Sequence, residues 1–517
     1  MAKPESGPQA SFAVFPLQGQ LLAGPRARVA VLVVGCVLLV AWQALFASMP
    51  ERLDRRYVLF AATGARENGR FVYFHYYLGL FPIATTLTDL DYSRAGALMV
   101  LEGRPETLLT EVGHTTRFGE LGVTWLYLPA ALWRGSAAAP TLRPANGAGF
   151  ILALLALFVA FWWAGQPILG GILVVLLGSN PFQLHEVYAR ENVFGWAITT
   201  VVASLAACVP LLGLRRPWRG YPWVAAAAVG IGVGVVRQFR PEPMAVLVPA
   251  AVCLLAAGSF RWRVRIGAAA ALLVVFVATS WGCEAYFQHK VRVARARVLA
   301  VGGHPFPGPR DAYHRVWNTV WTGLGDFDGK HGYRWDDIAA FMYAEPVLAE
   351  RYGITLPPWF GTRELAHRNE FWDADRRYYR TPLEVPHYYE VVREKVLHDI
   401  ATDPLWYAGI LARRAWRVLA ETSPVRLALG PWWITVPMHG MVALAVVAVV
   451  VWARAWPWAK LLGFTLVLSL PALIIYSGRG QCLYSCYHMA AVALAAAAGL
   501  EGVLWYRRWR EKAGAGK

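Results

Sequence analysis

Long apolar runs, separated by short charged segments, dominate the pattern of hydrophobic and polar positions along the chain. A run of about 20 apolar residues crosses the hydrocarbon core of a bilayer as one helix. The runs at 167–179 and 222–236 are shorter and predict tilted or broken helices. The pattern predicts an all-α polytopic membrane protein with about ten transmembrane helices. We place them at 29–47, 147–164, 167–179, 192–214, 222–236, 241–258, 266–284, 431–453, 457–476 and 487–506.

The composition agrees with this class. Of the 517 residues, 57% are hydrophobic and only 16% are charged, and the mean hydropathy is +0.38. These values exclude an ordinary soluble protein. Arg26 and Arg28 precede the first apolar run, as basic residues do in a secretory signal, but its apolar core is too long for a signal. We therefore predict an anchoring span there.

The basic residues of the short loops indicate the orientation. Threading the spans from a cytoplasmic start places every basic cluster on one side, as the positive-inside rule requires. Both termini are then cytoplasmic, in the cytoplasmic (inner) membrane. The net charge of +17 is largely a topology signal and an attraction to anionic lipid, and no basic-aromatic motif for nucleic acid is present. The clusters are Lys3, Arg26 and Arg28; Arg215, Arg216 and Arg219; Arg261, Arg263 and Arg265; Arg454 and Lys460; and Arg507, Arg508, Arg510 and Lys512.

Three parts follow from this threading. Residues 1–284 form an N-terminal membrane module whose outer loop, 48–118, leads into an apolar segment at 121–133 that we place in the outer interface. Residues 285–430 form a small, mainly helical extracytoplasmic insert. Residues 431–517 hold the C-terminal membrane helices and a basic cytoplasmic tail.

The end of the insert is amphipathic. Leu405 to Ala420 sets apolar side chains against Arg413, Arg414 and Arg417. This pattern predicts an interfacial helix with its arginines at the level of the lipid headgroups. Anchoring is the favoured role, and binding of a donor phosphate is the alternative.

The chain offers little for metal or disulfide chemistry. Asp326 and Asp328 resemble the start of a calcium loop, but Lys330 stands where an EF-hand needs an oxygen ligand. We therefore expect no metal site there. Cys482 and Cys486, in the last outer loop, form either a disulfide or two free thiols.

Two carboxylates open an amphipathic helix in the first outer loop. Thr88-x-x-Asp91 has the form of a capping box, and Arg94 can pair with Asp91 three residues earlier. Asp89 has no dedicated partner in this pattern. A carboxylate at such a helix start can act as general base on a sugar or other hydroxyl, so we expect Asp89 to be the base and Asp91 a helper.

The second outer loop carries another group of charged residues. His185 and Glu186 are followed by Arg190 and Glu191. Glu186 and Arg190 stand four residues apart, so an ion pair that anchors the next span is the structural alternative to a substrate-binding role. Glu191 has no such neighbour.

Arginines in two further outer segments are candidates for phosphate binding. The turn that holds Arg237, Arg240 and Glu242 is broken by prolines and presents two guanidinium groups, which suit phosphate oxygens. The alternative is that both arginines are interfacial anchors. Arg479, in the last outer loop, is on the same predicted outer face and is a further candidate for lining a substrate cavity there.

These segments resemble the polytopic glycosyltransferases of the GT-C superfamily, which includes the protein mannosyltransferases and aminoarabinose transferases (glycosyltransferase family 39-like). The resemblance covers about the first half of the chain and implies a GT-C-like catalytic core in residues 1–284. It rests on the first span, Asp89-Leu90-Asp91-Tyr92-Ser93-Arg94-Ala95 with Gly103, the 121–133 segment with Pro129, Ser179-Asn180-Pro181, Arg190-Glu191 and Arg240-Pro241-Glu242.

The resemblance implies transfer of a sugar from a polyprenyl-phosphate-linked donor to a lipid, glycan or protein acceptor at the outer face. In that superfamily an aspartate of the first outer loop is the base, which maps onto Asp89, and a second acid maps onto Glu191 or Glu186. The family's acidic pair is adjacent, whereas Leu90 separates Asp89 from Asp91 here. The Trp-Trp-Asp signature of oligosaccharyltransferases is absent, so we do not expect transfer of a preassembled oligosaccharide.

This chemistry needs no cofactor, although a divalent cation that bridges an acid and the phosphate is an alternative. A transporter or flippase of lipid-linked sugars is the rival function, and it should carry ionisable groups near the middle of the membrane and internal repeats. The spans hold almost no such groups, and we find no repeat. A non-catalytic envelope assembly protein would share the topology without needing Asp89.

Overall fold

The computed structural model describes most of the first membrane module and of the insert. The described residues are 24–49, 122, 125–126, 129, 142–189, 193, 195–212, 217–240, 242–300, 316–356, 371–372, 378–379, 385–420, 423–429 and 432–438. This described part of the chain is mainly helical and contains two short antiparallel strand pairs.

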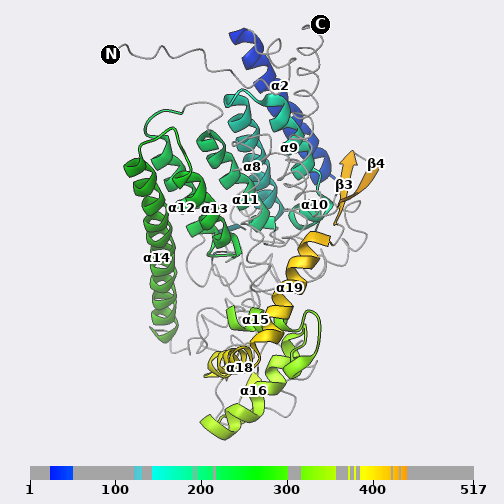
Figure 1. The fold of residues 1–517 in the computed structure, drawn as a ribbon. Helices are drawn as coiled ribbons and strands as arrows, with labels where there is room; N and C mark the ends of the chain where they lie inside the picture. Colours follow the sequence, from blue (N-terminus) through cyan, green and yellow to red (C-terminus); the bar gives the residue numbers. More distant parts are fainter. Residues whose placement is uncertain are drawn as a thin grey trace, which may run out of the picture.

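Apolar helices pack side by side in one bundle (Figure 1). In the described part of the chain, four helices are long and apolar enough to cross a membrane: Pro25–Ala47, Arg143–Trp163, Gly195–Leu212 and Trp262–Lys290. The bundle consists of α2 (Pro25–Ala47), α8 (Arg143–Trp163), α9 (Pro167–Gly178), α11 (Gly195–Cys208) continued by the 3-10 turn η3 (Val209–Leu212), α12 (Tyr221–Val236), the 3-10 turn η4 (Glu242–Val246) with α13 (Leu247–Leu255), and α14 (Trp262–Ala300).

Small residues let α12 and α14 approach closely. A Cβ atom on Gly230 would lie 2.9 Å from the backbone oxygen of Leu272, and one on Gly234 would lie 2.8 Å from Cβ of Thr279. Helices in membranes pack through such small residues because lipid tails provide no hydrophobic driving force between helices. The glycines of α12 therefore set its distance from α14.

Hydrogen bonds show which helix ends lie together. The indole nitrogen of Trp162 donates to the carbonyl of Arg28 at 2.9 Å, so the start of α2 lies beside the end of α8. Tyr221 donates to the carbonyl of Ala207 at 2.8 Å, which joins the start of α12 to the end of α11. Arg265 donates to the carbonyl of Leu255 at 2.9 Å, where α14 begins beside the end of α13.

The helices therefore alternate in direction, as the threading predicted. One end of the bundle, which we name the basic end, carries the described arginines of the predicted cytoplasmic clusters: Arg26, Arg28, Arg219, Arg261, Arg263 and Arg265. The opposite end, which we name the polar end, carries buried polar side chains of the predicted outer turns: Asn146, Asn180, Gln183, Glu186 and Gln238.

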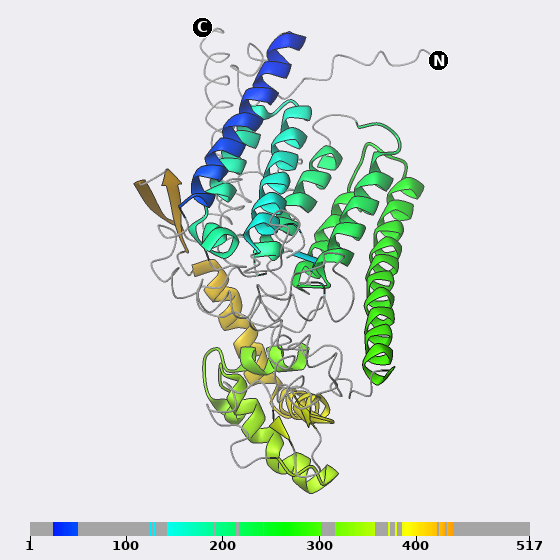
Figure 2. The same cartoon turned by 180° about the vertical axis from the view of Figure 1, so that it is seen from behind.

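The insert has a hydrophobic core of its own. It packs around Trp321, Tyr388 and Val392, and Figure 2 shows its helices beyond one end of the bundle. Its helices are α15 (Val316–Leu324), the 3-10 turn η5 (Lys330–Gly332), α16 (Asp337–Tyr352), α18 (Tyr388–Thr402) and α19 (Pro404–Ala420), and a short pair joins β1 (Phe371–Trp372) to β2 (Tyr378–Tyr379).

Two boundaries differ from the prediction. The span predicted at 266–284 belongs to a longer helix, because α14 continues to Ala300. The span predicted at 431–453 does not begin as a helix: β4 (Trp432–Met438) pairs antiparallel with β3 (Ser423–Leu429), and β3 lies against α10 (Pro181–Leu184). Its aromatic and β-branched residues favour a strand. The spans predicted at 457–476 and 487–506 lie outside the described residues.

Candidate functional site

A π-helical turn lies at the polar end of the bundle. After α9, Ser179 and Asn180 lead into α10, and η2 (His185–Ala189) follows with π-helical geometry. The side-chain oxygen of Asn180 accepts a hydrogen bond from the backbone nitrogen of Gln183 at 3.2 Å and so caps this segment. Single π turns insert an extra residue and are frequent at functional sites.

This turn carries a buried carboxylate. Glu186 is fully buried, and its Oε1 lies 3.3 Å from Nδ1 of His185, whose side chain is one-quarter exposed. A buried carboxylate needs hydrogen-bonding or charged partners because burial removes its hydration. The pair thus places an acid and an imidazole together, with the imidazole on the accessible side.

The π turn is tied to three other helices. The side-chain nitrogen of Gln43 donates to the carbonyl of Gly178 at 2.8 Å, and the hydroxyl of Tyr188 donates to the side-chain oxygen of Gln43 at 3.1 Å. The side-chain nitrogen of Gln183 donates to the carbonyl of Gly195 at 3.2 Å, at the start of α11. Because all these side chains are buried, the contacts fix the backbone that carries Glu186.

The turn with the two candidate phosphate-binding arginines lies at the same end. The indole nitrogen of Trp196 donates to the side-chain oxygen of Asn146 at 2.8 Å, and its ring packs edge-on against Phe239, with centroids 5.2 Å apart. Phe239 is fixed between Arg237, which is exposed, and Arg240, which is half-buried. The start of α8, the start of α11 and the Arg237–Arg240 turn therefore meet.

Part of the predicted interfacial segment at 121–133 lies where the start of α8, the start of α11 and the Arg237–Arg240 turn meet. The backbone nitrogen of Gly122 donates to the carbonyl of Gln238 at 3.1 Å. Leu126 is buried in the same small hydrophobic cluster as Val193 and Phe239. This places 122 and 126 at the polar end, on the side where the sequence predicted them.

The structure thus places four of the predicted site residues at the polar end of the bundle, with His185 and Glu186 in the π turn and Arg237 and Arg240 in the turn after α12. The backbone of Glu242 begins η4 beside them, but its side chain is not described. Asp89, Asp91, Arg190, Glu191 and Arg479 lie outside the described residues.

Sequence reasoning missed Gln43 and Tyr188. Gln43 lies in a segment that reads as ordinary membrane helix, and Tyr188 lies in the predicted second outer loop; neither belongs to a motif. A single amide within an apolar run is a signal for Gln43, because a lone amide in a span needs a hydrogen-bonding partner. Nothing in the sequence identifies that partner as Tyr188.

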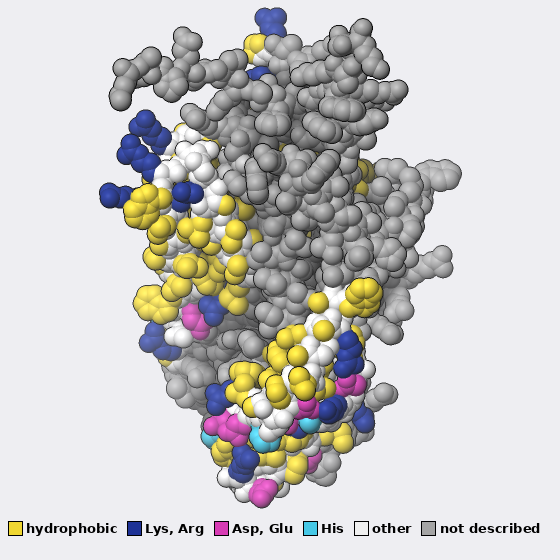
Figure 3. Space-filling model, viewed as in Figure 1, with side chains coloured by type: hydrophobic (Ala, Val, Ile, Leu, Met, Phe, Trp, Pro, Cys, Tyr) yellow, Lys and Arg dark blue, Asp and Glu magenta, His cyan; other side chains and the backbone are white. Residues whose placement is uncertain are grey.

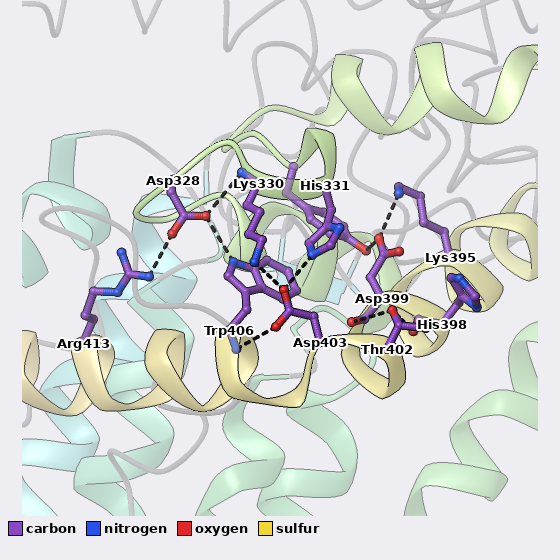
Figure 4. Close-up of polar contacts among 11 residues, drawn as sticks. Asp328, Lys330, His331, Lys395, His398, Asp399, Thr402, Asp403, Trp406 and Arg413 are labelled. Carbon is purple, nitrogen blue, oxygen red and sulfur yellow. Dashed lines mark hydrogen bonds and ion pairs between the residues drawn. The ribbon is translucent and has the colours of Figure 1, made fainter.

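The insert holds a second polar cluster, between the loop before α16 and the start of α19 (Figure 4). Asp403 accepts hydrogen bonds from the amino group of Lys330 and, at 3.2 Å, from the backbone nitrogen of Trp406. Its Oδ2 lies 3.2 Å from Nε2 of His331. The hydrogen bond from Lys330, reinforced by the contacts with Trp406 and His331, lowers the pKa of Asp403 below its usual range.

Asp328 completes this cluster. Burial alone would raise its pKa, but hydrogen bonds from Trp406 at 3.2 Å and Arg413 at 2.8 Å outweigh burial and lower it. Beside it, Arg414 is fully buried and donates to Asp326 at 3.2 Å. The two carboxylates that resemble a calcium loop therefore bind arginines of α19.

These contacts show what two of the arginines predicted at headgroup level bind in the structure. Arg413 and Arg414 both bind the aspartates of the loop before α16, and Arg414 is fully buried there, so its side chain faces protein and not lipid. Their charges attach α19 to the insert. Within the described residues, no group of three metal-ligating side chains lies together.

Comparisons of the chain with protein-family models, with curated proteins and with solved structures found no match.

Proposed function

We propose that the protein is an integral membrane glycosyltransferase. It transfers a sugar from a polyprenyl-phosphate-linked donor to a lipid, glycan or protein acceptor at the outer face of the cytoplasmic membrane. The observation that supports this proposal best is the buried Glu186 with His185, held in a π turn at the polar end of an apolar bundle. An acid positioned at that level can act on the polar part of a lipid whose tail lies beside the helices.

The proposed reaction is one displacement at the anomeric carbon. Asp89 takes the proton of the acceptor hydroxyl, whose oxygen forms the new bond to that carbon. The bond from the anomeric carbon to the phosphate oxygen breaks, and the lipid phosphate leaves with the electron pair. Arg237 and Arg240 stabilise the charge of the departing phosphate, and Glu186 and Glu191 are candidates to orient the acceptor or sugar hydroxyls.

The distribution of charge supports an enzyme over a transporter. Among the described residues of the bundle, Glu186 is the only charged residue that is fully buried, and it lies at one end of the bundle. A transporter or flippase needs ionisable groups along a path near the middle of the membrane. The described helices offer no such path.

The test is a transfer assay with the full chain reconstituted in lipid vesicles. Radiolabelled sugars on polyprenyl phosphate are supplied with a lipid or glycan acceptor fraction, and nucleotide sugars serve as the comparison donors. The proposal expects transfer from the lipid-linked donors and none from the nucleotide sugars. If no cation takes part, transfer continues in the presence of a chelator. Movement of the labelled lipid across the vesicle membrane without transfer would favour the flippase, and neither activity would favour the assembly protein.

A further inference from the structure

One face of α14 is exposed along the whole apolar part of the helix. Leu273, Val274, Val277 and Trp281 on this face are half or more exposed, with Trp281 at 73%. In a bundle of membrane-spanning length, an exposed apolar face of this kind lies against lipid. Figure 3 shows it as an apolar band on the α14 side, with Lys and Arg side chains above and below the band.

The same face becomes basic beyond Trp281. Steps of seven residues along a helix return to nearly the same face, so Val274, Trp281, residue 288 and residue 295 follow one line. Position 288 is an exposed glutamine, and Arg292 beside it is exposed. Position 295 is an arginine, so this line leads from lipid-facing valine through tryptophan to arginine.

The length of the helix sets the depth of these residues. Starting from the exposed Ile266, a hydrocarbon core of about 30 Å ends about 20 residues later, close to residue 285. Arg292 lies about 10 Å beyond that point, a few ångströms outside a headgroup layer that is about 5–8 Å thick and within reach of a long side chain. Cα–Cβ bonds in a helix tilt toward its N-terminus, which here is the membrane side, so the Arg292 side chain starts back toward the headgroups.

The opposite side of the helix holds it in place at this depth. Phe287 is buried, and its ring stacks on Trp125 with centroids 4.7 Å apart. The carboxylate on this stretch, Glu284, accepts a hydrogen bond from the side-chain nitrogen of Gln288 at 3.3 Å. The stretch from 284 to 297 therefore contains one carboxylate and four basic residues, namely Lys290, Arg292, Arg295 and Arg297.

We propose that this basic extension of α14, residues 288–297, binds the headgroups of anionic lipids at the polar end of the bundle. The arginines contact lipid phosphate, the tryptophan marks the interface, and the apolar face contacts the tails. This inference does not rest on the proposed glycosyltransferase activity, because it needs only the lipid-facing side of α14 and the charges that continue it.

The test measures lipid retention by the purified full chain. Native mass spectrometry after titration with phosphatidylglycerol or phosphatidylcholine compares the wild type with the Arg292→Gln/Arg295→Gln double variant. We expect the wild type to prefer phosphatidylglycerol. The double variant should lose this preference by about fivefold for each arginine removed, since an arginine near an anionic surface contributes about 1 kcal/mol.

A matched variant, Arg334→Gln/Arg393→Gln, removes the same charge from two exposed positions of the insert. It should retain phosphatidylglycerol as the wild type does. Equal losses in both double variants would mean that only net charge matters, and unchanged retention in the α14 variant would also overturn the proposal. Gel filtration and thermal unfolding of each variant establish that it is folded.

Discussion

The hydroxyl of Tyr188 donates a 3.1 Å hydrogen bond to the side-chain oxygen of Gln43, 145 residues earlier in the chain. Gln43 in turn donates to the carbonyl of Gly178, at the end of α9. This buried chain of two bonds connects α2, α9 and the π turn. It therefore positions the segment that presents Glu186.

Breaking this chain should destabilise the bundle. Tyr188→Phe removes one hydrogen bond and should lower the free energy of unfolding by about 1 kcal/mol. Gln43→Leu removes the partner of both the Tyr188 hydroxyl and the Gly178 carbonyl, which stay buried, and should lower it by about 1–3 kcal/mol. The free energy of unfolding in mixed micelles measures both. Because the two side chains share one bond, the double variant should cost less than the sum of the single variants, and strict additivity would contradict the coupling.

The close packing of α12 on α14 gives a second prediction. Gly230→Ala forces a methyl group to within 2.9 Å of the Leu272 backbone oxygen and should destabilise the protein by about 1–3 kcal/mol. Gly232 is the control, because nothing lies within 4 Å of a Cβ atom there. Gly232→Ala should be neutral or stabilise the helix by up to about 1 kcal/mol. Equal effects of the two substitutions on the unfolding midpoint would refute the packing argument.

The cluster around Asp403 predicts a pH dependence in the insert. Hydrogen bonds hold the folded pKa of Asp403 and Asp328 below the unfolded value, which is about 3.9. Their stabilisation is therefore complete above about pH 4 and is lost as the pH falls through the lowered folded pKa. Hydrogen exchange of residues 325–334 in the full chain should accelerate as the pH drops from 5 to about 3, beyond the intrinsic change in exchange rate.

Asp403→Asn supplies the comparison for that experiment. The variant lacks the titrating carboxylate, so its exchange at residues 325–334 should be faster than in the wild type at pH 6 and should change less between pH 5 and about 3. An equally steep change in the variant would show that other groups control this loop.

Much of the fold could be predicted because lipid imposes a simple rule on the sequence. Apolar runs located the seven described bundle helices, and the arginines beside them gave their alternating directions. The end of α14 escaped this reasoning, since residues 285–300 are polar enough to read as a loop although they continue the helix. The strand at Trp432–Met438 escaped it because a hydrophobic run of β-branched and aromatic residues suits either a span or a strand.

The candidate site was predictable only in its charged residues. His185, Glu186, Arg237 and Arg240 are unusual beside apolar runs, and the polar end brings their segments together through Trp196 and Phe239. The partners of Arg413 and Arg414 could not be predicted, because an amphipathic pattern does not show whether its charged residues contact lipid or a protein carboxylate. Their partners, Asp326 and Asp328, lie more than eighty residues earlier in the chain.

The buried Glu186 gives a prediction for activity. Glu186→Gln keeps the size of the side chain and removes its charge, and it should lower kcat/KM for the lipid-linked donor by at least about tenfold through lost orientation of substrate hydroxyls. Thr200→Val, a buried polar substitution in α11, serves as a control that should leave kcat/KM within about twofold. Equal losses in the two variants would assign Glu186 a structural role only.

The most direct test of the central claim is the rate of sugar transfer from polyprenyl phosphate by Asp89→Asn, compared with Asp91→Asn, in the reconstituted full chain. The proposed mechanism needs Asp89 as base, whereas Thr88 and Arg94 account for Asp91. We therefore expect Asp89→Asn to lower kcat by about 100-fold or more and Asp91→Asn to lower it by less than about tenfold. Wild-type rates in the Asp89→Asn variant would contradict the mechanism.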